Sequence, residues 1–280
     1  MVLGKTSLST KVVHFIIMAL LIMYAISIIY PLCWMAMSGF KSNREIMLNT
    51  WALPSKWLWD NYELAWEYGV KQYFLNSVIV TIASVVLTIA ISAIAAFALS
   101  RFEFSYKELV LAIIIGGLML SPQVGLISLY KLLSSLRIYN TYWALIISYT
   151  AYRIPFTVFL MRSYFITLPR EVEESAFIDG CNSWQVFSKI VLPMSRPIIA
   201  TSALLTAMFT WNEFMFALVF IEDNSLRTVP VGLMNLRGAL TTKWSVLLAG
   251  LTLSALPMII MFLIFQKQLI RGLTSGSVKG

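Results

Sequence analysis

The sequence predicts an all-α protein that crosses a membrane several times. Of its 280 residues, 59% are hydrophobic and only 12% are charged, whereas a soluble domain carries about 25% charged residues. The polar residues are too few to cover the surface of a soluble fold of this length. Lipid must therefore contact much of the exterior. The apolar runs are continuous rather than alternating, which excludes a β-barrel. They must be helical, because backbone polar groups in lipid have to pair internally.

Six segments meet or approach the roughly 20 apolar residues that a crossing helix needs. They lie near residues 12–37, 77–99, 109–131, 141–161, 198–220 and 244–265. We expect one membrane domain over residues 1–280. The first segment is longer than the roughly 7–15 residue apolar region of a secretion signal, so we interpret it as a retained span. The Trp-rich stretch 39–74 is expected to lie along one membrane face.

The net charge is +8, but Lys and Arg are scattered singly between apolar runs. This pattern indicates anchoring at lipid headgroups and no nucleic-acid partner. Basic residues divide almost evenly between the two sides of the predicted topology, so the positive-inside rule decides little. The charged loop 100–108 and the two termini favour an N-terminus inside the cell.

No catalytic or cofactor chemistry is predicted. His14 is the single histidine, and Cys33 and Cys181 fit no metal site or disulfide framework. The triplet at residues 4–6, Gly-Lys-Thr, lacks the earlier glycine of a phosphate loop, so the chain cannot bind ATP by that route. Any energy from ATP must reach it through a partner.

The loop 162–197 contains the most local structural signals. Pro169 suits the first position of a helix, and Glu171, Glu173 and Glu174 follow it near the positive end of the helix dipole. Gly180 suits the position after the helix, where a positive φ is needed. We therefore predict a short helix that ends in a turn at Gly180.

A second helix is expected directly after this turn, capped by Asn182 or Ser183. Trp184, Phe187 and Val191 would share one of its faces. Pro193 and Pro197 are expected to end the helix before the next span. Periodicity alone leaves two readings open: the apolar face binds a partner, or it lies on the membrane surface or on the chain's own helices.

The same loop resembles the EAA signature of permease subunits in binding-protein-dependent ABC importers. That pattern is E-A-A, three residues, G, nine residues, then I-x-L-P. Here residues 174–176 (Glu-Ser-Ala) are followed by three residues, Gly180, nine residues and residues 190–193 (Ile-Val-Leu-Pro). Only Ser175 departs from the pattern, and it too is small.

Weaker similarity to maltose-type sugar permeases covers much of the chain. It rests on residues 61–62 (Asn-Tyr), 74–77 (Phe-Leu-Asn-Ser), 211–214 (Trp-Asn-Glu-Phe) and the tail 271–280. The resemblance implies six core helices in a bacterial-type cytoplasmic membrane, with both termini and the EAA loop in the cytoplasm. It also implies a second, different permease subunit, two ATP-binding-cassette ATPase subunits and an extracytoplasmic sugar-binding protein. The implied function is ATP-driven import of sugars or oligosaccharides, with catalysis on the ATPase rather than on this chain.

The resemblance further implies which residues contact the ATPase. Glu174 is the expected partner of a basic ATPase residue, Ser175 and Ala176 permit close approach, and Gly180 makes the turn. Ile190, Leu192 and Pro193 set the second helix against the membrane. The predicted docking set is Glu173, Glu174, Ser175, Ala176, Asp179, Gly180, Ile190, Leu192 and Pro193.

Several polar residues are expected inside the membrane, where a charge costs about 2.5–3.5 kcal/mol on insertion scales. Trp211, Asn212 and Glu213 in the fifth span, and Gln123 after Pro122, are candidates for the translocation pathway. The alternative for Glu213 is a structural hydrogen bond to a neighbouring helix, and both readings stay open. Arg153 lies about 10 Å from Glu213 in estimated depth, so a direct pair is not expected.

Two other classes of function fit the sequence less well. A secondary transporter or channel for a small polar solute would need coupling-ion sites, for which one membrane glutamate gives thin support. An intramembrane enzyme would need a nucleophile and base, or metal ligands, meeting at one depth. The sequence shows no such cluster.

Overall fold

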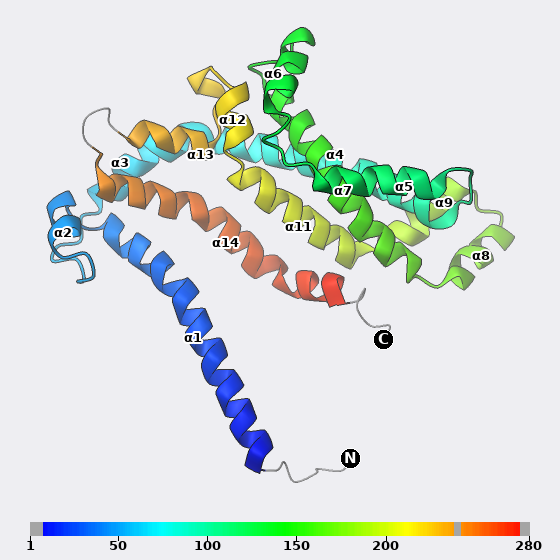
Figure 1. Cartoon of the computed structure of the whole chain (residues 1–280), viewed down its shortest axis with the longest axis horizontal. Coiled ribbons are helices and arrows are strands. Elements are labelled where there is room, and N and C mark those ends of the chain that lie inside the picture. Colours follow the sequence, from blue (N-terminus) through cyan, green and yellow to red (C-terminus); the bar gives the residue numbers. More distant parts are fainter. Residues whose placement is uncertain (1–7, 238–241, 275–280) are drawn as a thin grey trace. The chain divides into compact units, whose positions relative to one another are not determined.

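The computed structural model describes residues 8–237 and 242–274, and this part of the chain is built from helices (Figure 1). Within the described residues, the one β-type pairing is an isolated bridge between Arg237 and Thr242. The all-α prediction is therefore confirmed for this part of the chain. Residues 1–7 and 275–280, which include both termini and the end of the maltose-type tail, lie outside the described residues.

The helices keep the labels of Figure 1. Their bounds are α1 Leu8–Gly39, α2 Asn43–Leu48, α3 Asp60–Ala65, α4 Lys71–Arg101, α5 Lys107–Gly116, α6 Leu126–Ser135, α7 Tyr142–Ile166, α8 Arg170–Ile178, α9 Ser183–Val186, α10 Leu192–Met194, α11 Arg196–Asn212, α12 Met215–Phe220, α13 Val229–Gly232 and α14 Trp244–Thr274. Single π-helical turns at Trp66–Val70 and Phe187–Val191 lead into α4 and α10, and short 3₁₀ turns lie at Gly117–Met119, Asn224–Leu226 and Leu233–Leu236.

The chain forms two compact units, which are described separately. One unit contains Met1–Gly69 and Asn235–Ser254, and the other contains Val70–Met234 and Ala255–Gly280. The single domain expected from the sequence stays a prediction.

In the first unit, the chain folds back on the end of α1 through aromatic contacts. The Phe40 ring lies 5.0 Å from that of Trp57 and 4.7 Å from that of Trp59. The Tyr62 hydroxyl donates a hydrogen bond to the Ala36 carbonyl at 2.7 Å. These contacts fix the Trp-rich segment against α1, and its place along a membrane face stays a prediction.

Among the described residues, four helices are long and apolar enough to cross a membrane. They are Val12–Gly39, Asp60–Arg101, Tyr142–Ile166 and Trp244–Leu269. A fifth candidate arises if the bent pair Ser183–Met194 and Arg196–Asn212 counts as one span. Six continuous spans were expected, so this part of the prediction needs correction at two places.

The expected span 109–131 is not one helix. It is divided between α5 and α6, which have ten residues each and are separated by a 3₁₀ turn and residues 120–125. A ten-residue helix is about 15 Å long and cannot alone cross a hydrocarbon core of about 30 Å. Gly116, Gly117 and Pro122 lie at this break, and such residues are common causes of interrupted helices.

The expected span 198–220 is also interrupted. α11 ends at Asn212, Glu213 adopts an extended backbone with ψ of 129°, and α12 begins at Met215. At its other end, α11 meets the preceding helical segment at an angle of 77°. The fifth apolar run is therefore a broken helix rather than a straight one.

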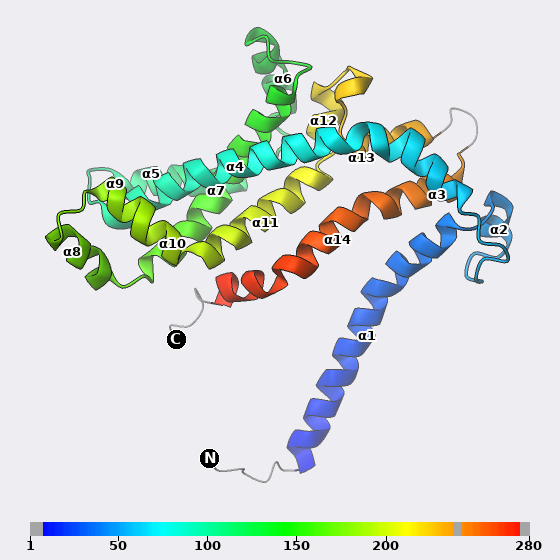
Figure 2. The ribbon, with the colours of Figure 1, turned by 180° about the vertical axis from the view of Figure 1, so that it is seen from behind.

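In the second unit, α4 lies against both α7 and α11, as Figures 1 and 2 show from opposite sides. Small hydroxyl residues recur along the buried side of α4 at intervals of three or four, the spacing of one helix face. They are Ser77, Thr81, Ser84, Thr88 and Ser92. Small residues let helix backbones approach closely in membranes, where the hydrophobic effect does not drive helices together.

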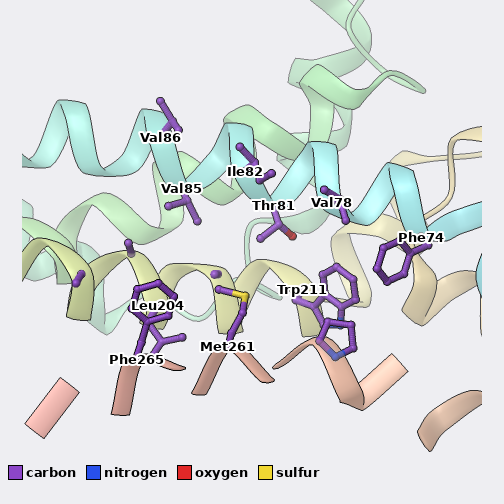
Figure 3. Close-up of a pocket in the computed structure, with 14 residues that line it drawn as sticks. Phe74, Val78, Thr81, Ile82, Val85, Val86, Leu204, Trp211, Met261 and Phe265 are labelled. Carbon is purple, nitrogen blue, oxygen red and sulfur yellow. The ribbon is translucent and has the colours of Figure 1, made fainter. Parts of the chain in front are cut away.

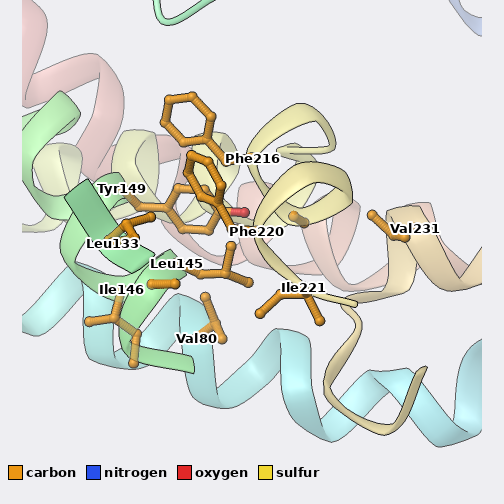
Figure 4. Close-up of a cluster of buried hydrophobic side chains, with 11 residues drawn as sticks. Val80, Leu133, Leu145, Ile146, Tyr149, Phe216, Phe220, Ile221 and Val231 are labelled. Carbon is orange, nitrogen blue, oxygen red and sulfur yellow. The ribbon is translucent and has the colours of Figure 1, made fainter. Parts of the chain in front are cut away.

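One cluster of buried side chains joins α12 and α6 to the long helices α4 and α7 (Figure 4). Val80 of α4 and Leu145 of α7 pack there with Phe216 and Phe220 of α12, and Leu133 contributes from α6. The two short helices are thus held by the long ones, although neither could be stable alone at this length.

Glu213 accepts hydrogen bonds from backbone N–H groups at the break in the fifth apolar run. Its carboxylate accepts hydrogen bonds from the backbone N–H of Phe216 at 2.9 Å and of Ala217 at 3.2 Å. It also accepts one from the Tyr149 hydroxyl of α7 at 2.7 Å. The first N–H groups of any helix lack a partner within the helix, so Glu213 both caps α12 and ties it to α7.

We expect Glu213→Ala to destabilise the protein, because it leaves two backbone N–H groups and the Tyr149 hydroxyl unpaired. Each unpaired buried group costs about 1–3 kcal/mol. The melting temperature in detergent, followed by tryptophan fluorescence, should fall by at least about 3 °C.

A double-mutant cycle with Tyr149→Phe tests the contact itself. The hydroxyl and the carboxylate share one hydrogen bond, so the effects of Glu213→Ala and Tyr149→Phe should not add. Glu213→Gln, which keeps one acceptor oxygen, should lose less stability than Glu213→Ala. Strictly additive effects would contradict the hydrogen bond between Tyr149 and Glu213.

Candidate functional site

The loop between α7 and α11 forms the two-helix hairpin that the sequence predicts. α8 begins at Arg170, so Pro169 precedes the helix as its N-cap instead of occupying its first position. Gly180 has a φ of +84°, as expected for the turn after α8. The Asn182 side chain accepts from the backbone N–H of Gln185 at 2.9 Å, and the Gln185 side chain accepts from that of Asn182. This reciprocal cap starts α9.

One side of α8 faces the helix bundle. Glu173 and Ala176 are buried, with 6% and 7% of their surface exposed. Ala176 packs with Phe97 of α4, Phe165 of α7 and Val186 of α9. Two members of the predicted docking set therefore point into this chain.

Arg101, the last residue of α4, is the partner of Glu173. Its Nε lies 2.8 Å from each carboxylate oxygen, and its second guanidinium nitrogen lies 2.6 Å from Oε1. That nitrogen also donates to the carbonyl of Phe165 at 2.8 Å. A contact through two guanidinium nitrogens fixes the orientation of the carboxylate relative to the guanidinium as well as the distance between them.

The opposite side of α8 is exposed. Glu174 and Ser175 lie there, and Ile178 has 87% of its surface exposed. The Ser175 hydroxyl donates to the Glu171 carbonyl one turn earlier at 2.8 Å, so it adds little polarity to this surface. Asp179 and Gly180 are exposed at the end of the helix. The hairpin thus presents an apolar tip beside a carboxylate.

The second half of the hairpin turns the chain back to the bundle. Ile190 and Leu192 are half-buried in the same apolar cluster as Ala176, whereas Pro193 is exposed. The face predicted for Trp184, Phe187 and Val191 divides, because the latter two are buried and 63% of Trp184 is exposed. Pro193 does not end the helix, which instead bends at Ser195.

The predicted pathway residues do not form one cluster. Glu213 is turned toward Tyr149 and α12, which matches the structural reading of this residue. Asn212 is exposed, with its amide donating to the Met208 carbonyl at 2.8 Å. Gln123 is exposed in the segment before α6 and pairs with the Ser121 hydroxyl.

Trp211 lines a cavity of about 320 Å³ between α4, α11 and the second half of α14 (Figure 3). The centroid of the Phe74 ring lies 5.6 Å from that of the Trp211 ring. Of the side chains that line this cavity, two carry a polar group: Thr81 with its hydroxyl and Trp211 with its indole N–H. A sugar needs several well-placed polar groups, so this wall gives a sugar few partners.

Arg153 lies in α7 with its guanidinium 4.9 Å from the Phe156 ring and 5.2 Å from the Phe209 ring. These are cation–π distances. Glu213 takes its hydrogen bonds elsewhere, in line with the expectation that the two charges do not pair. Within the described residues, no three His, Cys, Asp or Glu side chains come together as metal ligands.

Two well-connected residues received no role from the sequence. Arg101 counted only as a loop charge, and nothing local indicates a partner 72 residues away. Asn76 belongs to the Phe-Leu-Asn-Ser stretch at residues 74–77. Its amide donates to the carbonyls of Ser225 at 2.7 Å and Arg227 at 2.9 Å, and its oxygen accepts from the Tyr142 hydroxyl at 2.7 Å. It therefore holds the loop after α12 against α4.

Comparison with known proteins connects this hairpin to a family. Residues 70–275 match the family described as "Binding-protein-dependent transport system inner membrane component". The "Probable ABC transporter permease protein YurM" of Bacillus subtilis (strain 168) is 57% identical over 260 residues, which cover 93% of this chain and 87% of YurM. The "Trehalose/maltose transport system permease protein MalG" of Thermococcus litoralis (strain ATCC 51850 / DSM 5473 / JCM 8560 / NS-C) is 35% identical over 264 residues, covering 92% of this chain and 94% of MalG.

The fold has a solved counterpart. A chain in the crystal structure of a bacterial ABC transporter involved in the import of the acidic polysaccharide alginate aligns with a TM-score of 0.82 at 22% identity. The alignment covers 94% of this chain and 99% of that one. With the family match and the two relatives, it follows that this chain belongs to the inner membrane components of binding-protein-dependent transport systems, as an ABC transporter permease subunit.

Proposed function

We propose that this permease imports a sugar or oligosaccharide, and that ATPase subunits drive it by docking on the exposed side of α8. The observation that carries the proposal is the division of α8 into two sides. One side is anchored to the chain through Glu173 and Ala176, and the other leaves Glu174 and Ile178 exposed.

The exposed side of α8 has the character of a docking surface. A large apolar side chain as exposed as Ile178 gains free energy when a partner covers it. The neighbouring Glu174 carboxylate suits a basic residue on that partner and would fix the orientation of the contact. The positive φ of Gly180 lets the chain turn directly after α8, so the tip can enter a cleft.

The cargo is proposed from the relatives. MalG is described as a trehalose/maltose permease, and it matches this chain over nearly its whole length. The apolar wall around Trp211 suggests that this chain contributes few polar contacts to the sugar. We therefore assign most of the sugar recognition to a second, different permease subunit and to an extracytoplasmic sugar-binding protein.

The proposed topology has six crossings, with the pairs α5–α6 and α11–α12 each completing one crossing as broken helices. Both termini and α8 then lie in the cytoplasm, where a pair of ATP-binding-cassette subunits can reach the hairpin. ATP binding would favour one conformation of the importer through contacts with α8 that differ between the two states. The helices would thereby alternate access to the cargo between the two sides of the membrane.

Deletion of this chain from a cell that contains the whole importer should abolish uptake of its sugar. Uptake of a panel of radiolabelled di- and oligosaccharides measures this, with an amino acid and a dipeptide as controls. Loss confined to a carbohydrate supports the proposed cargo. Loss confined to the amino acid or the dipeptide would refute it.

Glu174→Lys should release the ATPase subunits without unfolding the permease, because Glu174 is exposed and Lys would repel a basic partner. We expect at least a tenfold drop in ATPase copurified in mild detergent, about 1.4 kcal/mol of binding free energy. Glu108→Lys is the matched control, since Glu108 is an exposed glutamate of α5. Equal ATPase recovery with both variants would be inconsistent with docking through Glu174.

A further inference from the structure

We propose that the Arg101–Glu173 ion pair transmits the movement of α8 to α4, with Arg101 as the positioning residue. The inference rests on the proposed function, because it assumes that an ATPase moves α8. It adds the route by which that movement enters the membrane helices.

Three helices meet at the Arg101 guanidinium. Arg101 is the last residue of α4, the Phe165 carbonyl that it contacts lies in the last turn of α7, and Glu173 lies in the first turn of α8. A cation is favoured at the C-terminal end of a helix and an anion at the N-terminal end. The charges of all three helix ends therefore support the same contact.

The pair is buried, with 8% of the Arg101 side chain and 7% of the Glu173 side chain exposed. Water therefore competes weakly for either charge, and the fork of the guanidinium sets the angle between α4 and α8. The pair between Glu103, in the adjoining loop, and Lys107, the first residue of α5, differs, because 83% of the Glu103 side chain is exposed, although only 12% of the Lys107 side chain is. Such a surface pair holds its partners only loosely.

α8 has little else that attaches it to the bundle directly. Of its nine residues, Glu173 and Ala176 are the buried ones. An alanine buries only a methyl group, so its packing permits sliding. The ion pair is thus the contact that determines in which direction a displacement of α8 moves α4.

α4 can transmit that displacement to the rest of the second unit. It has 31 residues, so it extends over about 46 Å. Its side chains Phe74, Thr81 and Val85 line the cavity beside α11, and Asn76 near its other end holds the loop at residues 225–227. Displacement of Arg101 would therefore reach both the cavity wall and this loop.

The test separates transmission from folding by replacing the ion pair with apolar residues. A buried ion pair can often be exchanged for apolar residues without loss of stability, whereas removal of one partner leaves a buried charge unpaired. Arg101→Met combined with Glu173→Leu should therefore melt near the wild-type temperature. Lys107→Met combined with Glu103→Leu is the matched control at the pair whose carboxylate is exposed.

The whole importer is reconstituted in proteoliposomes with its sugar-binding protein, and sugar uptake and ATP hydrolysis are measured together. We expect the Arg101/Glu173 double variant to retain its ATPase subunits but to lower sugar transported per ATP by about tenfold, within the usual range of coupling between sites. Arg101→Lys keeps the charge but lacks the fork, so its loss should be smaller, about threefold. The Lys107/Glu103 double variant should match the wild type.

The outcomes assign failure to one proposal or the other. Wild-type proteoliposomes without ATP-dependent sugar uptake would refute the proposed function itself. Where the wild type transports, the inference is overturned if the apolar double variant transports as much sugar per ATP. Should that variant not fold, wild-type coupling in Arg101→Lys would overturn it equally.

Discussion

The hydrocarbon core of a membrane supplies no water, so each backbone N–H and C=O that a helix leaves open there needs a partner within the protein. This constraint explains why the long segments of the chain are helices, and it is most visible where a helix stops. At Glu213 the chain breaks between α11 and α12, and a carboxylate accepts from two freed N–H groups and from Tyr149. The charge that looks costly in the sequence is thus part of the backbone hydrogen bonding.

The polar side chains of α4 have different roles along the helix and at its ends. Its buried side carries hydroxyls small enough for α7 and α11 to pack closely, while its two ends carry the residues that reach other segments. Asn76 binds backbone carbonyls near one end, and Arg101 binds a carbonyl and a carboxylate at the other. The helix interior therefore serves packing, and the helix ends serve connection.

Much of the local structure could be predicted from the sequence, because its causes are local. The turn at Gly180 and the cap at Asn182 follow from residue chemistry within a few positions. The continuity of the 109–131 segment was mispredicted, because an apolar composition satisfies lipid whether or not the helix is straight. The burial of Glu173 could not be inferred from its neighbours, since its partner lies 72 residues earlier in the chain.

In the proposed docking, the two sides of α8 would be subject to different constraints. The inward side must fit Arg101 and the apolar cluster of this same polypeptide, whereas the outward side, in the proposed docking, would need to fit only the ATPase subunit. Changes that alter the choice of cargo can therefore accumulate elsewhere in the bundle without touching the outward side. A single ATPase could then serve several permeases that differ in cargo, provided that each keeps the same exposed surface on this one short helix.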